Sequence, residues 1–118
     1  MKIPPVLFTF LMLLVGCASQ SGSSYREITR QEAAEIMALQ KSCILLDAGT
    51  KKEYERCHIP GAIHLPDEEI GENIVSLLRD KDQMILIYSR SGKRSRQAAE
   101  TLSRLGCTNV LEFVGITT

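Results

Sequence analysis

Apolar runs alternate with helically spaced apolar positions along residues 25 to 118 of this chain. The runs predict strands at 25–29, 43–47, 62–65, 84–88 and 110–114. The helical spacing predicts helices from about residue 30 to 40, at 51–56, from 67 to about 78 and from about 94 to 105. Thr29 with Glu32 three residues on has a capping-box pattern, and Asp67 can cap the third helix. Alternation at this spacing predicts an α/β fold, an open parallel sheet with helices on both faces.

The run at 84–88 is followed by the segment that contains the most candidate functional residues. A loop from Ser89 to Arg94 follows it and contains Gly92, and a helix then begins. Backbone N–H groups and the positive end of a helix dipole converge at such a junction, which therefore favours an anion. The basic residues on this stretch are Arg90, Lys93, Arg94 and Arg96. Ser89 occupies the first loop position, where a nucleophile would stand.

The composition limits the alternatives. A chain of 118 residues has room for one small domain, and its 44% apolar and 24% charged residues are ordinary for a globular protein. Basic and acidic residues number 14 each, and without Lys2 the net charge is about −1. No overall charge attracts nucleic acid, so no nucleic-acid partner is expected and the basic cluster is local.

The N-terminus has the pattern of an export signal. Lys2 precedes an apolar stretch of about ten residues, too short for a permanent membrane helix. The ending Leu14-Val-Gly-Cys17 looks like a bacterial lipobox, in which Cys17 would carry the lipid; the alternative is an ordinary signal peptide with Cys17 uninvolved. We therefore expect a lipoprotein signal peptide at 1–16, a flexible tether at 17–24 and one domain at 25–118. With Ala18 after the Cys, enteric-type sorting would favour the outer membrane, facing the periplasm, in a Gram-negative cell.

With these residues in place, the chain resembles the rhodanese-like family over nearly all of residues 25 to 118. The matching segments are Leu45-Leu-Asp47, Glu53-Tyr54, His58-Ile-Pro-Gly-Ala-Ile-His-Leu-Pro66, Tyr88-Ser-Arg-Ser-Gly-Lys-Arg-Ser95 and Ala98-Ala99 with Leu102 and Leu105-Gly106. The resemblance implies a sulfurtransferase fold whose loop Cys takes sulfane sulfur from a donor such as thiosulfate and passes it on from a persulfide. It also implies that the anion-binding loop consists of Arg90, Ser91, Gly92, Lys93 and Arg94. Asp47 is expected to support this loop by hydrogen-bonding its amides.

The chain departs from this pattern at the reactive position. Ser89 stands where the family has Cys, and an alcohol neither ionises near neutral pH nor carries sulfur as a thiol does. Persulfide-based transfer is therefore expected to be lost or strongly impaired. The segment Val114-Gly-Ile-Thr-Thr118 also ends where relatives usually continue, so the C-terminal end of the fold is expected to be shortened.

The remaining cysteines precede predicted strands. A parallel sheet would place Cys43, Cys57 and Cys107 at its N-terminal end, opposite the loop, as small buried apolar residues. A disulfide between Cys43 and Cys57 is a second interpretation, because their strands are expected to be neighbours and an exported compartment is oxidising. In the chain-entropy model such a bond would contribute on the order of 3 kcal/mol.

Other chemistries have weaker support. His58 and His64 lack ligand-spaced partners, so structural roles are favoured over metal binding, and no cofactor is expected. No motif supplies a His base for Ser89 as a hydrolase nucleophile. Two hypotheses remain: a lipid-anchored sulfurtransferase-type protein impaired in transfer, or a noncatalytic module. The module would bind a small sulfur-containing anion or a protein partner at the cell envelope, where the lipid would attach the chain to the membrane.

Overall fold

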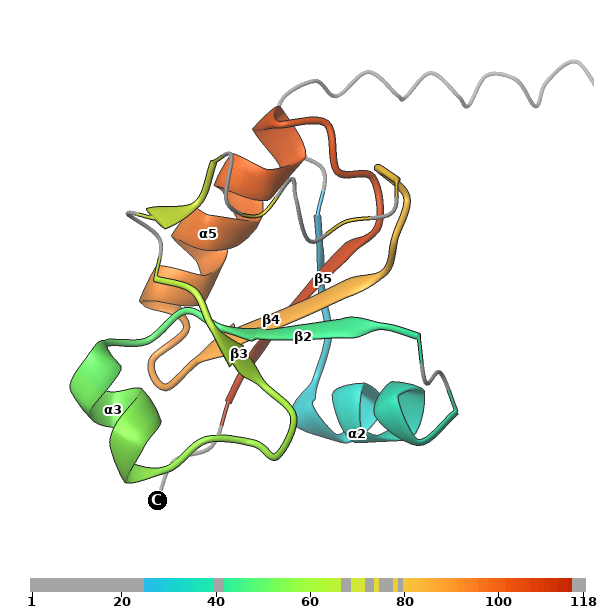
Figure 1. Cartoon of the computed structure of the whole chain (residues 1–118). Helices are drawn as coiled ribbons and strands as arrows, with labels where there is room; N and C mark the ends of the chain where they lie inside the picture. The colour runs from blue at the N-terminus through green and yellow to red at the C-terminus, as the bar shows by residue number, and fades with distance from the viewer. Residues whose placement is uncertain are drawn as a thin grey trace, which may run out of the picture.

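The computed structural model describes residues 25–39, 42–66, 69–71, 74, 78 and 80–115. Within these residues five parallel strands form one sheet in the order β1-β5-β4-β2-β3 (Figure 1). The strands are β1 (Arg26–Glu27), β2 (Ile44–Asp47), β3 (Ile63–His64), β4 (Ile85–Ser89) and β5 (Val110–Val114). β4 lies in the middle of the sheet and all five of its residues are buried, as its apolar run requires of a strand covered on both faces.

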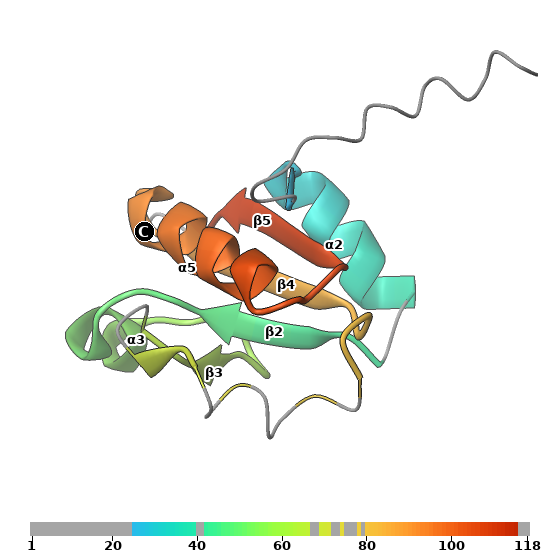
Figure 2. The same cartoon turned by 90° about the horizontal axis from the view of Figure 1, so that it is seen from above.

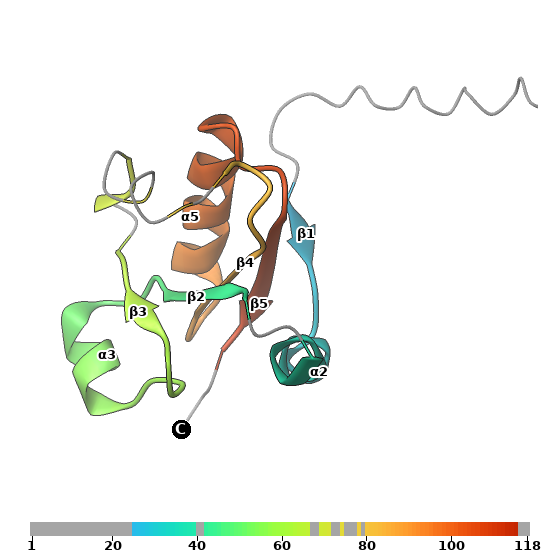
Figure 3. The ribbon, with the colours of Figure 1, turned by 45° about the vertical axis from the view of Figure 1, so that its right-hand side comes forward.

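Helices cover the two faces of the sheet. Helix α5 (Lys93–Arg104) lies over one face and α2 (Arg30–Leu39) over the other, while α3 (Lys51–Arg56) follows the end of β2 (Figures 2 and 3). Two apolar clusters result: Leu46, Ile87 and Leu102 belong to the one on the α5 side, and Leu86 and Phe113 to the other. The predicted α/β class is therefore confirmed. No helix in the described part of the chain has the length and apolar character needed to cross a membrane.

The predicted cap of the first helix is confirmed atom by atom. The N–H of Thr29 donates to Glu32 Oε1 at 2.8 Å, and the N–H of Glu32 donates to Thr29 Oγ1 at 3.0 Å. A second reciprocal pair, which the sequence analysis did not identify, joins Thr50 and Glu53 at the start of α3. This second cap fixes the chain where it leaves the carboxyl end of β2.

Several element boundaries differ from the prediction. β5 and α3 have the predicted bounds, whereas β1, β2 and β3 are shorter than predicted. β4 is shifted by one residue, so that Ser89 is the last residue of the strand and not the first of the loop. The bounds of the helix predicted from Asp67, and residues 116–118, lie outside the described residues. Ile74, on that helix's predicted apolar face, is nonetheless buried in the cluster beneath α5.

The carboxyl ends of β4 and β5 are joined closely. The N–H of Gly115 donates to the carbonyl oxygen of Ser89 at 2.8 Å. A Cβ at position 115 would overlap Cδ2 of Tyr88, whose ring is buried. Glycine therefore lets the end of β5 pass directly against the strand that carries Ser89.

Candidate functional site

Ser89 lies at the carboxyl end of the central strand, where ligand sites of parallel sheets form. Only 2% of its surface is exposed. The chain then turns through residues 90 to 92 and enters α5 at Lys93. Since β2 and β5 flank β4 on either side, the end of β2 and the end of β5 both border this turn.

Gly92 makes the turn into α5. It is the N-cap of the helix and has a φ of 88°, in the left-handed region that favours glycine. A Cβ at this position would lie 2.8 Å from Nη1 of Arg96 and 3.1 Å from Cγ2 of Val114. The Arg96 guanidinium thus folds back over the loop, and the loop is packed against the end of β5.

Two backbone amides converge on the side chain of Ser89. The N–H of Gly92 and the N–H of Ser95 donate to Ser89 Oγ, at 3.1 and 3.0 Å. A third loop amide, that of Lys93, donates to Ser91 Oγ at 3.2 Å. The predicted convergence of amides at a helix N-terminus is therefore present, and Ser89 Oγ lies at its centre.

A series of buried side-chain hydrogen bonds runs inward from Ser89. Its hydroxyl donates to Ser95 Oγ at 3.1 Å, and the Ser95 hydroxyl donates to Glu112 Oε2 at 2.6 Å. The carbonyl oxygen of Gly92, 3.2 Å from Ser95 Oγ, is an alternative acceptor for the same proton. Ser95 is fully buried and Glu112 is 2% exposed, so these hydrogen bonds link position 89 to a buried carboxyl group beneath the loop.

The environment of Glu112 favours its neutral form. Burial raises the pKa of this carboxyl above its ordinary value, and the charge of Glu27 raises it further. The hydrogen bond from Ser95 and the charge of Arg96 act in the opposite direction, toward a lower pKa. The sequence analysis missed Glu112, although its position was a signal: it interrupts the apolar run of a strand that was expected to be covered on both faces.

The basic side chains surround the outer side of the turn. Arg90, Lys93 and Arg96 are exposed, and Arg94 is half-buried. The ion pair between Lys51 and Glu55 on α3 does not involve the three exposed cations. The exposed cations of the loop are therefore available to a dissolved anion.

Asp47 has contacts in its own loop. It is buried at the end of β2, and its Oδ1 accepts from the N–H of Gly49 at 2.8 Å. It also lies near the Tyr88 hydroxyl. Burial is the main cause of the raised pKa of this phenol, and the nearby Asp47 raises it further. The predicted bond from Asp47 to amides of the 89–94 loop is not among the hydrogen bonds of the described residues, so its contact with the site is indirect.

The two histidines bind backbone carbonyls. His58 Nδ1 donates to the carbonyl of Tyr54 at 2.7 Å, and its ring stacks on the Tyr54 ring. His64 Nε2 donates to the carbonyl of Gly49 at 2.8 Å. In the described part of the chain no cluster of three or more potential ligands could hold a metal ion.

The prediction of a disulfide is wrong for the described cysteines. Cys43, Cys57 and Cys107 are not joined in a disulfide. Cys43 precedes β2 and Cys57 follows α3, at opposite ends of β2; four strand residues span about 13 Å, too far for a disulfide.

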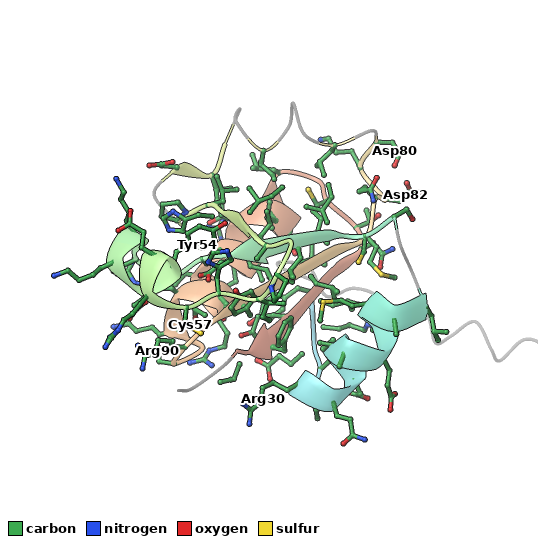
Figure 4. The ribbon with its side chains drawn as sticks, turned by 60° about the horizontal axis from the view of Figure 1, so that its bottom comes forward. Arg30, Tyr54, Cys57, Asp80, Asp82 and Arg90 are labelled. Atoms are coloured by element: carbon green, nitrogen blue, oxygen red, sulfur yellow. The ribbon has the colours of Figure 1, made fainter. Side chains whose placement is uncertain are left out.

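The placement of Cys57 at the N-terminal end of the sheet is also wrong. Two residues later the N–H of Ile59 donates to the hydroxyl of Tyr88, which directly precedes Ser89. Cys57 is exposed and lies on the same side of the molecule as Arg90 (Figure 4). Cys107 is buried, as expected, whereas Cys43 is only half-buried, and burial raises the pKa of both thiols. Cys17 lies outside the described residues.

Comparison with known proteins gives consistent matches. The family model described as Rhodanese-like domain matches residues 29–115. The putative sulfur carrier protein YrkF of Bacillus subtilis (strain 168) is 34% identical over 82% of this chain, which spans 51% of that relative's length. Thiosulfate sulfurtransferase PspE of Escherichia coli (strain K12) is 35% identical over 60% of this chain and 68% of the relative.

Solved structures agree with these matches. A rhodanese-like domain protein from Staphylococcus aureus superposes with a TM-score of 0.66, at 26% identity over 76% of this chain and 85% of that one. A structure described as rhodanese with anions from E. coli gives a TM-score of 0.56, at 33% identity over 58% of this chain and 81% of the other.

The raised pKa of Glu112 predicts a pH dependence of stability. Above the ordinary pKa of about 4.3 the unfolded chain loses this proton while the folded chain retains it, so stability falls as pH rises through the interval up to the folded pKa. Glu112→Gln removes this loss. Urea unfolding at pH 4 and pH 7 should show a smaller loss of unfolding free energy in Glu112→Gln than in the unmodified protein. Glu35→Gln, at an exposed site on α2, should retain the original loss; equal losses in all three proteins would contradict the prediction.

Proposed function

The chain belongs to the rhodanese-like family, and on this premise we propose that it binds a small sulfur-containing anion at the 89–94 loop without turning it over by persulfide chemistry. The observation that carries the proposal is the group of exposed cations, Arg90, Lys93 and Arg96, around the turn from β4 into the N-terminus of α5, whose amides from Gly92 and Ser95 point at position 89. Anion binding requires only such donors and charges. Sulfur transfer requires a thiolate at their centre.

The assignment of Ser89 to the position of the family's Cys rests on the loop resemblance. Its place at the end of the central strand, directly before the turn into α5, supports that assignment. The relatives support the substrate class: one is named a thiosulfate sulfurtransferase, and one solved neighbour is described as containing anions. We infer that this chain retains the anion binding of that family without the sulfur transfer.

Binding should depend on the cations of the rim. Calorimetric titration with thiosulfate at low ionic strength should give a measurable affinity that Arg90→Ala weakens about tenfold, because a hydrogen bond to a charged group contributes roughly 1.5 to 3 kcal/mol. Arg104→Ala is the matched control: it removes the same charge at the far end of α5 and should leave the affinity nearly unchanged. Absence of heat with the unmodified protein, or equal weakening by both variants, would refute a receptor at this loop.

Turnover should require a sulfur atom at position 89. The unmodified domain should produce no thiocyanate from thiosulfate and cyanide above background, whereas Ser89→Cys should produce it measurably. Both forms should be assayed with Cys57→Ser as well, because the exposed Cys57 lies on the loop side of the molecule. Substantial thiocyanate formation by the unmodified protein with Cys57→Ser would contradict our account of Ser89.

We further propose that Cys17 carries a lipid that holds the domain at the cell envelope, on the outer membrane if the cell is Gram-negative. The support is the sequence Leu14-Val-Gly-Cys17 after a short apolar stretch. In a bacterial host the full chain should incorporate labelled palmitate and fractionate with membranes. Cys17→Ser should abolish both, and Cys43→Ser should change neither; a labelled Cys17→Ser protein would exclude this site.

A further inference from the structure

Glu112 is a carboxylic acid held beneath the loop by the chain's own polar contacts. It comes from β5, on the sheet face that α5 covers, whereas Asp47 at the end of β2 binds the amide of its own loop. Two hydrogen bonds, through the single hydroxyl of Ser95, separate its carboxyl from Ser89 Oγ. A group at position 89 therefore has amides on one side and a buried acid on the other.

The charge of Glu112 affects whether position 89 can hold a neutral or a negatively charged group. A hydroxyl is neutral, and it can donate to Ser95 while Ser95 donates to Glu112. A thiolate or a persulfide in the same place would be a second negative charge within a few ångströms of the carboxylate, in a buried site where water screens little. Like charges at this range raise the pKa of a thiol, whereas catalysis through sulfur needs that pKa lowered.

We propose that Glu112 disfavours a sulfur anion at position 89 and favours the neutral hydroxyl found there, so that Ser89→Cys alone would not give a fully activated thiolate. This inference rests on the proposed function, in which Ser89 stands in for the family's Cys. Glu112 acts through Ser95 and through its charge, and is therefore a positioning residue.

The surrounding charges do not cancel this effect. Glu27 on β1 adds negative charge next to Glu112, and the phenol of Tyr25 is also near. Arg96 on α5 is the opposing cation, but it is exposed and lies over Gly92 on the outer side of the turn. Burial raises the pKa of Glu112, and the Ser95 hydrogen bond and Arg96 partly oppose this rise. A thiol titrates at a pH several units above the ordinary range of a carboxyl, where Glu112 carries its charge.

The test measures the acidity of a thiol introduced at position 89. Ser89→Cys is prepared with Cys57→Ser, alone and together with Glu112→Gln, which retains an oxygen acceptor for Ser95 but no charge. The rate of iodoacetamide labelling is followed from pH 5 to 10, and the peptide that contains position 89 is quantified by mass spectrometry to separate it from Cys43 and Cys107. Glu112→Gln should lower the pKa of the introduced thiol by about one unit or more and raise its labelling rate several-fold at pH 7.

Two controls make the outcome decisive. Glu27→Gln, an exposed acid on β1, should shift the thiol pKa less than Glu112→Gln, and Glu35→Gln on α2 should not shift it. An unchanged thiol pKa with Glu112→Gln in folded protein, judged by circular dichroism, would overturn the inference. If Glu112→Gln does not fold, Ser89→Cys alone decides: a thiol pKa near or above the ordinary value of about 8.5 supports the inference, and one clearly below it refutes it.

Failure of this inference and failure of the proposed function give different results. Thiol acidity needs no bound anion and no turnover, so the inference can fail while calorimetry still detects thiosulfate at the loop. Conversely, the unmodified protein can fail to bind thiosulfate while Glu112 still controls the acidity of a thiol at position 89. Thiocyanate formation by Ser89→Cys with Glu112→Gln should exceed that by Ser89→Cys several-fold, and the reverse order would count against the inference.

Discussion

The site depends on the burial of β4 in the middle of a parallel sheet. Because β2 and β5 pair with both of its edges and both faces are covered, its residues are apolar until the strand ends. Ser89 is the last residue of the strand, and it lies where the chain must turn sharply to start α5. The left-handed Gly92 makes that turn and directs the loop amides at Ser89 Oγ. The anion-binding geometry thus follows from where a buried strand stops.

Burial also explains why the polar groups beneath the loop occur together. A carboxyl group on the inner face of β5 is costly without a partner, and Ser95 is positioned by the first turn of α5 to donate to it. The Ser95 oxygen accepts from the Ser89 hydroxyl while its own proton is donated to Glu112. The contacts form one connected network, so a change at any of these three positions alters the hydrogen bonding of the other two.

The sequence predicted the layers and the loop better than the contacts inside them. Periodicity located β5 and the buried core of β4, because these depend on which faces are covered. The Thr29–Glu32 cap followed from local chemistry. Asp47 and Cys57 were placed less well, since their surroundings depend on how the α3 segment crosses the end of the sheet. Glu112 was missed because no local rule says which buried side chain a strand acid will meet. Its partner is 17 residues away in sequence.

The two signs of charge around position 89 have different consequences for binding and for catalysis. The exposed Arg90 and Lys93 lie on the outer side of the turn and attract an anion arriving from solvent. On the proposed account, the buried Glu112 opposes a negative charge fixed covalently at position 89, where the distance to the carboxyl is shortest. Its effect on a dissolved anion held by the exposed cations is weaker, because that anion is farther away and better solvated. Reversible anion binding is therefore compatible with both charges, whereas carrying a persulfide is compatible only with the outer ones.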